Sequence, residues 1–188
     1  MEQLILVTKN KRKITEANSL AKAFGIEFAM PEIGDKLEIQ AESPVEVSEF
    51  GAKNAFPQVK RPLLVEDSGL FVKSLNGFPG VYSAQVLARI GNKGILKLME
   101  GIDDREAHFE CALSFFDGKE MKSFVERVNG SIIFKEKGDT GFGFDPIFSP
   151  NDYNGKSFGE VSIEEKTSLS HRGKAFVAFC KWYSNEER

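Results

Sequence analysis

Apolar and polar positions alternate along the chain with two different periods, which predicts strands and helices in turn. Residues 3–8 have the composition of a short strand, and apolar residues then recur at helical spacing as far as Gly25. A second strand is predicted at residues 26–30. A second helix is predicted to begin at Ser43, because a serine cap is followed at once by a proline and, three residues on, by a glutamate. Pro57 is expected to end that helix.

The second half of the chain has the period of a strand over a long stretch. Residues 105–116 place an alternating row of apolar side chains on one face, and His108 falls on the opposite face as a surface or packing residue. Asp117-Gly118 and Asn129-Gly130 are typical hairpin turns. They predict an antiparallel meander that is completed by two shorter strands, 121–127 and 131–134.

Two more helices complete the predicted elements. One is expected at residues 92–100, with Asn92 as its cap, and the other ends the chain and contains Trp182. Strands that alternate with helices and then continue as a meander indicate an α/β fold.

The segment 63–71 is the one around which the chemistry is organised. Its apolar start is typical of a buried strand, and it is expected to end in Glu66, Asp67, Ser68 and Gly69. Carboxylates at the end of a buried strand cost free energy unless something pairs with them. Mg²⁺ is a suitable partner, since it prefers oxygen ligands and is usually held by one or two carboxylates plus substrate phosphates. The alternative is a strand that continues into an acidic turn with Gly69 at the bend.

A basic cluster stands at the start of the first helix. Positive charge at a helix N-terminus opposes the helix dipole, unless an anion binds there and interacts with the dipole, the free N–H groups and the cations together. Phosphate binding is therefore favoured over a solvated helix start or a nonspecific nucleic-acid patch. The chain has no P-loop motif in this position. The cluster and its flanking residues are Thr8, Lys9, Asn10, Lys11, Arg12 and Lys13.

Two stretches near the C-terminal end carry further candidate binding residues. The segment 138–146 is rich in glycine, which lets a backbone approach a ligand, and an exposed ring on such a loop can stack on a base. Phe142 is expected to turn into the core, and Phe144 is the better candidate for stacking. Ser162 begins a capping box, after which Lys166, His171 and Arg172 supply donors; the alternative is a capped helix with solvated charges.

Composition narrows the function classes. The chain has 188 residues, 41% of them hydrophobic and 28% charged, which is enough for one large domain or two packed lobes. A net charge of −3 argues against nucleic acid as a partner. No signal peptide and no membrane-length apolar run are expected. Cys111 and Cys180 are isolated, which indicates reduced thiols in a cytoplasmic protein.

Taken together, these stretches resemble the inosine triphosphate pyrophosphatase family, in order and over nearly the whole chain. The resemblance is carried by an opening Thr-x-Asn-x-x-Lys, an acidic strand, a glycine/proline loop and two late motifs, which here are residues 8–13, 66–70, 77–83, 141–148 and 170–173. It implies one domain over residues 1–188, with a long mixed sheet flanked by helices and two lobes with the active-site cleft between them. It also implies hydrolysis of ITP, dITP or XTP to the monophosphate and pyrophosphate.

The resemblance further implies residue roles. Residues 8–13 would hold the triphosphate, Asp67 would bind Mg²⁺ and activate water, and Ser68 would touch the substrate. Further metal ligands would be Glu66 and an acid before the second helix, which is matched by Glu38, with Glu42 as the fallback. Lys53 is a possible additional lysine of that helix.

The base and sugar pocket would be formed by residues near the C-terminal end: Phe142, Gly143, Phe144, Asp145, Lys166, His171 and Arg172. Donor-only side chains such as Lys166 and Arg172 suit a 6-keto purine, because O6 accepts a hydrogen bond whereas the adenine amino group donates one.

The resemblance also implies partners, and two alternative functions stay open beside it. The resemblance implies a purine nucleoside triphosphate as substrate, a homodimer, and neither nucleic acid nor membrane as a partner. One alternative is a related pyrophosphatase that acts on other modified triphosphates. Another is a catalytically silent nucleotide- or RNA-binding module, against which the intact pair Glu66-Asp67 argues, because carboxylates without a metal repel polyanions.

Overall fold

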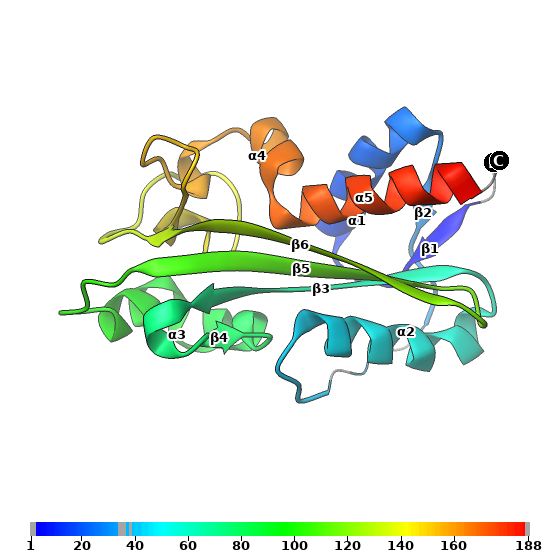
Figure 1. Cartoon of the computed structure of the whole chain (residues 1–188), viewed down its shortest axis with the longest axis horizontal. Helices are drawn as coiled ribbons and strands as arrows, with labels where there is room; N and C mark the ends of the chain where they lie inside the picture. The colour runs from blue at the N-terminus through cyan, green and yellow to red at the C-terminus, as the bar shows by residue number, and fades with distance from the viewer. Residues whose placement is uncertain (1–2, 34–36, 38, 187–188) are drawn as a thin grey trace. The chain divides into compact units, whose positions relative to one another are not determined.

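The computed structural model describes residues 3–33, 37 and 39–186, and it divides into two compact units. Unit 1 comprises Met1–Asp67, Cys111–Glu126 and His171–Arg188, and unit 2 comprises Ser68–Glu110 and Arg127–Ser170. The described residues form a seven-stranded sheet in the order β2-β1-β3-β5-β6-β7, with β4 paired to β3 (Figure 1). Three strands contribute residues to both units: β3 (Leu63–Val72), β5 (Glu106–Phe116) and β6 (Met121–Ile132).

Unit 1 has helices on both faces of its strands. Its first strand, β1 (Leu4–Leu6), pairs in parallel with β2 (Phe28–Ala29) and with β3. Leu64 of β3 packs into a core with α1 and α5, whereas Leu63 and Val65 pack with α2. Figure 1 shows α1 and α5 on one side of these strands and α2 on the other. The helices and the single 3₁₀ turn among the described residues of this unit are α1 (Lys11–Ala21), α2 (Pro44–Val59), α5 (His171–Glu186) and η1 (Lys22–Phe24).

The starts of the helices in unit 1 follow the sequence signals. Asn10 caps α1 by accepting the Arg12 N–H at 2.9 Å, and Ser43 caps α2 by accepting the Glu46 N–H at 3.3 Å. The prediction that Pro57 ends α2 is wrong, because the helix continues to Val59 with Pro57 in its last turn. Pro57 removes one helical hydrogen bond without ending the helix, which stops where Lys60 takes a left-handed conformation.

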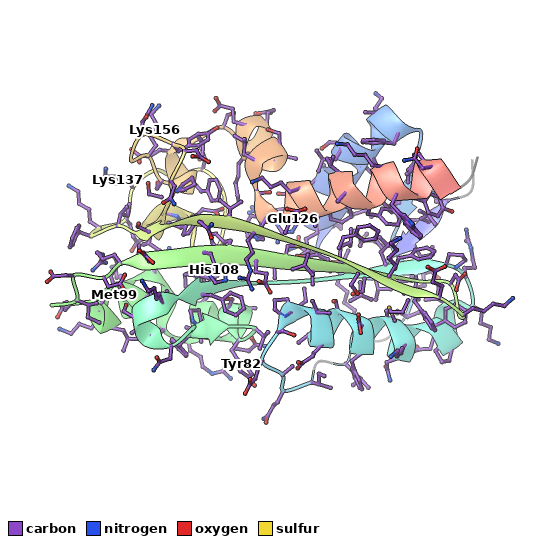
Figure 2. The ribbon with its side chains drawn as sticks, in the orientation of Figure 1. Tyr82, Met99, His108, Glu126, Lys137 and Lys156 are labelled. Carbon is purple, nitrogen blue, oxygen red and sulfur yellow. The ribbon has the colours of Figure 1, made fainter. Side chains whose placement is uncertain are left out.

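Unit 2 has its own core. Two short strands flank its sheet, β4 (Pro79–Gly80) antiparallel to β3 and β7 (Phe148–Pro150) antiparallel to β6. Met99, Phe148 and Phe158 are among the buried residues of this core, whereas Tyr82 is exposed (Figure 2). The helices and turns of the unit are α3 (Ser83–Leu98), α4 (Ile163–Leu169), η2 (Lys73–Leu75), η3 (Asp145–Ile147) and η4 (Phe158–Glu160).

Two glycines that the sequence assigned to bends stand inside strands instead. β3 runs straight through the acidic residues to Val72, and a Cβ at Gly69 would overlap the carbonyl oxygen of Gly80 on β4. The second predicted hairpin turn is also wrong, because β6 continues without a break to Ile132. A Cβ at Gly130 would overlap the Ser149 oxygen of β7. Both glycines therefore permit the close approach of a neighbouring strand.

The helix predicted at residues 92–100 is present as the second segment of a longer helix, and the prediction missed the first segment. Helix α3 begins nine residues earlier, at Ser83, and is interrupted at Gly91, whose φ of 62° and ψ of −168° are not helical. Asn92 does not act as the first cap; its side-chain amide donates to the carbonyl oxygen of Gly143 at 3.2 Å. Among the described residues, no helix is long and apolar enough to cross a membrane.

Candidate active site

Glu66 is the centre of a buried charged cluster in unit 1. Its side chain is 3% exposed and forms ion pairs with Lys13 of α1 and with Arg172 of α5, where Nε lies 3.3 Å from Oε1. The Cys111 thiol of β5 donates to the same oxygen at 3.6 Å. Arg172 also reaches Glu16, with Nη1 3.3 Å from Oε2. Four elements of unit 1 therefore meet at this cluster.

The cluster shifts the pKa values of two of its members. Burial, and next the charge of Glu66, raise the pKa of Cys111 well above its usual value, so that this thiol stays protonated. Burial alone would lower the pKa of Arg172, but the carboxylates of Glu66 and Glu16 outweigh that effect and raise it. The guanidinium is therefore charged at every relevant pH.

Asp67 lies on a different face of the strand from Glu66. Successive side chains of a strand point to opposite faces, and β3 is regular through both residues. Glu66 shares the face of Leu64, towards α1 and α5, so Asp67 shares the face of Val65, towards α2. Asp67 is half-buried. The two carboxylates were predicted to bind one metal together, and this alternation does not favour that arrangement.

The loop before α1 is shaped by its own side chains. The Thr8 hydroxyl accepts the Asn10 N–H at 3.1 Å, and the Asn10 side chain in turn caps the helix. Lys9, Lys11 and Arg12 are exposed, and the first turn of α1 has no acidic residue. Lys13, by contrast, is folded back onto Glu66 with a quarter of its side chain exposed. The loop thus presents cations and helix-start N–H groups at one end of α1.

In unit 2, Asp145 ties the glycine-rich loop to Lys166. One carboxylate oxygen accepts the Phe142 N–H at 2.6 Å and also forms an ion pair with Lys166 of α4. Gly141 is required here for two reasons: its φ is +80°, and a Cβ would overlap that same oxygen. The Lys166 ammonium lies 4.4 Å from the centre of the Phe142 ring. The loop, the carboxylate and the lysine are therefore one assembly.

The two phenylalanines of this loop have the opposite environments from those predicted. Phe144 is 3% exposed and belongs to the core of unit 2, whereas Phe142 is half-buried under the lysine ammonium. The positive φ angles of Gly141 and Gly143 turn the chain between the two rings and send them in different directions. Asn92, which the sequence did not single out for the site, holds the Gly143 carbonyl. Asn92 and Gly143 are 51 positions apart in sequence, so no local signal indicated this contact.

The remaining predicted residues are divided between the units. Ser68 is half-buried in unit 2, and His171 is buried at the start of α5 in unit 1. Glu38 lies outside the described residues. Glu42 is exposed, with its N–H 3.4 Å from Oε2 of Glu46, and Lys53 is exposed on α2. In the part of the chain that the structure describes, no three His, Cys, Asp or Glu side chains are grouped so that they could hold a metal.

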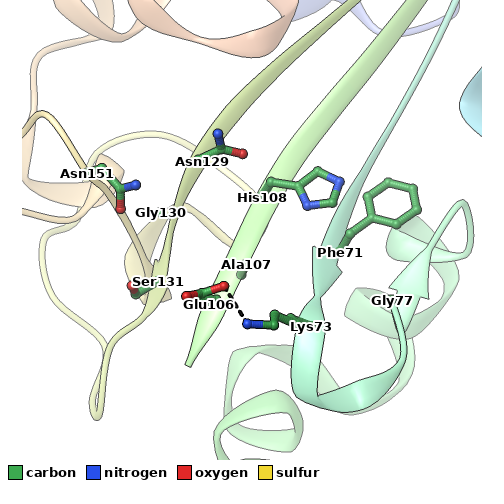
Figure 3. A pocket seen from close by; sticks show the side chains of 10 residues that line it. All are labelled: Phe71, Lys73, Gly77, Glu106, Ala107, His108, Asn129, Gly130, Ser131 and Asn151. Atoms are coloured by element: carbon green, nitrogen blue, oxygen red, sulfur yellow. Dashed lines mark hydrogen bonds and ion pairs between the residues drawn. The ribbon is translucent and has the colours of Figure 1, made fainter. Parts of the chain in front are cut away.

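A pocket of about 740 Å³ opens in unit 2, on the face of the sheet that carries Phe71 and His108 (Figure 3). The two rings stack with their planes 4° apart and their centres 5.0 Å apart. Lys73 donates to Glu106 at 2.7 Å along the same wall. None of the residues that the sequence assigned to catalysis or substrate binding lines this pocket. His108 packs against an aromatic ring, as its position on the strand predicted.

Comparison with known proteins gives a consistent result over nearly the full length. A model of the Ham1 family matches residues 4–182. The dITP/XTP pyrophosphatase of Saccharolobus solfataricus is 46% identical over 177 residues, which are 94% of this chain and 91% of that protein. The enzyme of the same name from Thermococcus kodakarensis is 44% identical and covers 96% of both chains.

Solved structures agree with these relatives. A HAM1 protein from Coxiella burnetii has a TM-score of 0.88 at 26% identity and covers 98% of this chain and 100% of its own. A nucleoside-triphosphatase described as dITP/XTP pyrophosphatase, from Mycobacterium abscessus, has a TM-score of 0.77 at 28% identity and covers 95% and 98%.

Proposed function

This chain belongs to the Ham1 family, and from that premise we propose that it hydrolyses non-standard purine nucleoside triphosphates. The substrates are dITP, XTP and ITP, and the products are the nucleoside monophosphate and pyrophosphate. Relatives named dITP/XTP pyrophosphatase match 94% and 96% of the chain. The observation that carries the proposal is the buried Lys166, a donor-only group held by Asp145 beside an aromatic ring. A purine with an acceptor at position 6 is the ligand that such a group favours.

The reaction is a displacement at the α-phosphorus. The oxygen of a water molecule forms the new bond to phosphorus, the bond to the α,β-bridging oxygen breaks, and pyrophosphate leaves with the bonding electrons. Asp67 accepts the proton of the attacking water, as a half-buried carboxylate can. Lys13 and the exposed cations at the start of α1 neutralise the charge of the leaving pyrophosphate. Ser68, the next residue of β3, contacts the substrate.

We further propose Mg²⁺ as the cofactor. Mg²⁺ takes oxygen ligands, keeps several waters and is commonly held by one or two carboxylates together with substrate phosphates. A half-buried carboxylate such as Asp67 fits that mode. Glu38, or Glu42 in its place, is the proposed second ligand. When bound, the ion would polarise the phosphate and lower the pKa of water.

Base selection is proposed to depend on Lys166. Its ammonium has three donors, one of which the ion pair with Asp145 uses. The O6 atom of hypoxanthine or xanthine accepts a hydrogen bond from a second N–H of this ammonium. The adenine amino group would leave that N–H unpaired, and a site of this kind rejects such a mismatch strongly. Phe142 supports the base in this proposal, because its ring lies beside the ammonium and is partly exposed. His171, Arg172 and Gly143 remain proposed members of the base and sugar site.

The assembly and location of the protein are also proposals. The two units are proposed to form one domain over residues 1–188 that is cytoplasmic and homodimeric. The two buried, free cysteines, Cys111 and Cys180, support a reducing compartment. Light scattering at several protein concentrations measures the dimer, and coincident unfolding transitions by two probes would support one domain.

The decisive experiment is a panel of nucleoside triphosphates with detection of pyrophosphate, with Mg²⁺ and with EDTA. ITP, dITP and XTP should yield the monophosphate and pyrophosphate, ATP should yield very little, and EDTA should abolish turnover. Release of orthophosphate and a diphosphate would exclude attack at the α-phosphorus. Binding of RNA without any turnover would favour the nucleic-acid-binding alternative, and turnover of other modified triphosphates would favour a related pyrophosphatase.

A further inference from the structure

The contacts of Glu66 occupy both of its carboxylate oxygens. Oε2 pairs with the Lys13 ammonium, and Oε1 accepts the Arg172 Nε–H and the Cys111 thiol. The side chain is 3% exposed, so these three groups replace its hydration shell. A cation could reach this carboxylate only by displacing one of two ion pairs.

Charge within the cluster is balanced. Lys13 and Arg172 contribute two positive charges, and Glu66 and Glu16 contribute two negative charges. Removing Glu66 alone would leave Arg172 paired with Glu16 but would break the ion pair of Lys13. A buried cation that loses its counter-ion costs far more than an exposed one, so the cluster favours an arrangement in which each cation keeps a carboxylate partner.

This arrangement fixes one of the cations at the helix start. Lys9, Lys11 and Arg12 are exposed and extend from the first turn of α1, but Lys13 is held against β3 with a quarter of its side chain exposed. An ammonium has three donors, and Glu66 uses one of them. A cation that is already oriented loses less conformational entropy when it binds an anion and stabilises developing charge without rearrangement.

We infer that Glu66, itself fixed by its ion pair with Arg172, is a positioning residue that holds Lys13 for the phosphate end of the substrate, and that it is not a ligand of the metal. The inference rests on the proposed function in one respect, namely that Lys13 contacts the triphosphate. It separates the two neighbouring acids by role: Asp67 acts on water and metal on one face of β3, and Glu66 acts through cations on the other.

The first test is the steady-state rate of ITP hydrolysis by Glu66→Gln, with ITP varied at saturating Mg²⁺ and then Mg²⁺ varied at saturating ITP. The substitution keeps the size of the side chain and removes its charge. A misplaced Lys13 should lower kcat/KM by roughly 10–100-fold, mainly through KM. The half-saturating Mg²⁺ concentration should not change. A rise in that concentration with unchanged KM would make Glu66 a metal ligand and overturn the inference.

Glu16→Gln is the matched control. It makes the same chemical change on the other carboxylate that contacts Arg172, and it leaves the pair of Lys13 with Glu66 intact. Its effect on kcat/KM should be less than about fivefold, as for a partly exposed ion pair. Equal losses of kcat/KM in both variants would show that the loss of a carboxylate partner of Arg172 is what lowers the rate. That result would contradict a role through Lys13.

A cycle with Lys13→Met tests the coupling directly. If Glu66 acts through Lys13, the double variant Lys13→Met/Glu66→Gln should lose no more kcat/KM than Lys13→Met alone, because the lysine to be positioned is gone. Additive losses would overturn the inference. Should Glu66→Gln fail to fold, Glu66→Asp serves in its place: it keeps the charge, shortens the side chain by one methylene and should show the same split between KM and Mg²⁺.

A binding measurement separates this inference from the proposed function. Calorimetry with inorganic pyrophosphate needs no turnover, and Glu66→Gln should weaken pyrophosphate binding roughly as much as it raises KM. If the wild-type protein hydrolyses no triphosphate and Glu66→Gln still weakens pyrophosphate binding, the proposed function fails and the positioning role stands. If the wild type is active and the variant binds pyrophosphate unchanged, the positioning role fails alone.

Discussion

Lys166 and Asp145 form a buried ion pair in unit 2, with side chains that are 9% and 4% exposed. The carboxylate also accepts the Phe142 N–H, so that one oxygen fixes both the lysine and the loop. A buried pair of this kind is a weak source of net stability but a strong constraint on geometry. This pair therefore orients the Lys166 ammonium, which is the proposed donor to the base.

Lys166→Met should collapse the discrimination between ITP and ATP. The methionine keeps an unbranched apolar stem and deletes all three donors. A site that hydrogen-bonds a substrate group can reject an analogue without that group by ~10⁴-fold or more, so kcat/KM for ITP should fall far more than that for ATP. The ratio of the two specificity constants is the measurement. Equal losses for both nucleotides would assign the lysine to phosphate binding or to structure.

The control for this variant is Lys156→Met, which makes the same change at an exposed lysine of unit 2 that extends into solvent (Figure 2). It should leave both specificity constants unchanged. Because Lys166→Met leaves Asp145 without its cation, it should also destabilise the protein by ~3–5 kcal/mol in urea unfolding. The double variant Lys166→Met/Asp145→Asn should recover part of that stability and none of the discrimination.

Asp67→Asn should abolish turnover and leave the fold intact. The amide keeps the shape of the carboxylate but neither accepts a proton from water nor contributes charge to a metal. Pyrophosphate release and a urea unfolding curve are the two measurements, and Asp103→Asn at an exposed position is the matched control. Activity close to that of the wild type would remove Asp67 from the mechanism.

The second metal ligand is decided by the pair Glu38→Gln and Glu42→Gln. The damaging substitution should raise the Mg²⁺ concentration needed for half-maximal rate, since a lost ligand weakens binding of the ion. We expect this effect at Glu38. The same effect at Glu42 would transfer the assignment to that residue.

Phe142→Ala and Phe144→Ala should have different consequences. Phe144 is a core residue, so its truncation should destabilise the protein by ~3–5 kcal/mol. Phe142 lies beside Lys166 and is proposed to stack on the base. Its loss should therefore weaken the binding of ITP and of ATP by a similar amount, roughly 1–3 kcal/mol. Unfolding free energies and KM values for both nucleotides test this division. A larger effect on KM from Phe144→Ala would restore the assignment made from the sequence.

Local signals in the sequence predicted local structure well. Ser43, Pro44 and Glu46 act on one another within a single turn, and the helix they predict begins where expected. The capping box at Ser162 is present for the same reason, with both of its reciprocal hydrogen bonds formed. Such interactions involve neighbours in sequence, so the chain carries the full information at that point.

Errors arose where a distant segment decides the role of a residue. Asn129-Gly130 has the composition of a turn, but Gly130 is needed because β7, some 20 residues further along, lies against it. The polar run after Val65 was interpreted as the end of a strand. Once the strand continues, alternation puts Glu66 and Asp67 on opposite faces. A glutamate can be buried there because Lys13 and Arg172, both distant in sequence, pair with it.

Acidification should destabilise the folded protein through His108. Burial, and next the charge of Arg127, lower the pKa of His108 below its usual value of 6.5, while Glu110 opposes this shift and Phe71 stacks on the ring. In the interval between the lowered pKa and 6.5 the unfolded chain binds a proton that the folded chain does not. The free energy of unfolding therefore falls as pH decreases through this interval, and the stabilising contribution is fully present above it.

Urea unfolding of the wild type and of His108→Gln, from about pH 8 to about pH 5, measures this effect. The glutamine does not titrate, so the stability of the wild type relative to the variant should decline on acidification. The decline should be smaller in an Arg127→Gln background, because one cause of the lowered pKa has been removed. A relative stability that stays constant or rises at low pH would show that the neutral imidazole is not the form that the fold prefers. Because the sequence contains one other histidine, only this difference between the two proteins, and not the wild-type curve alone, reports on His108.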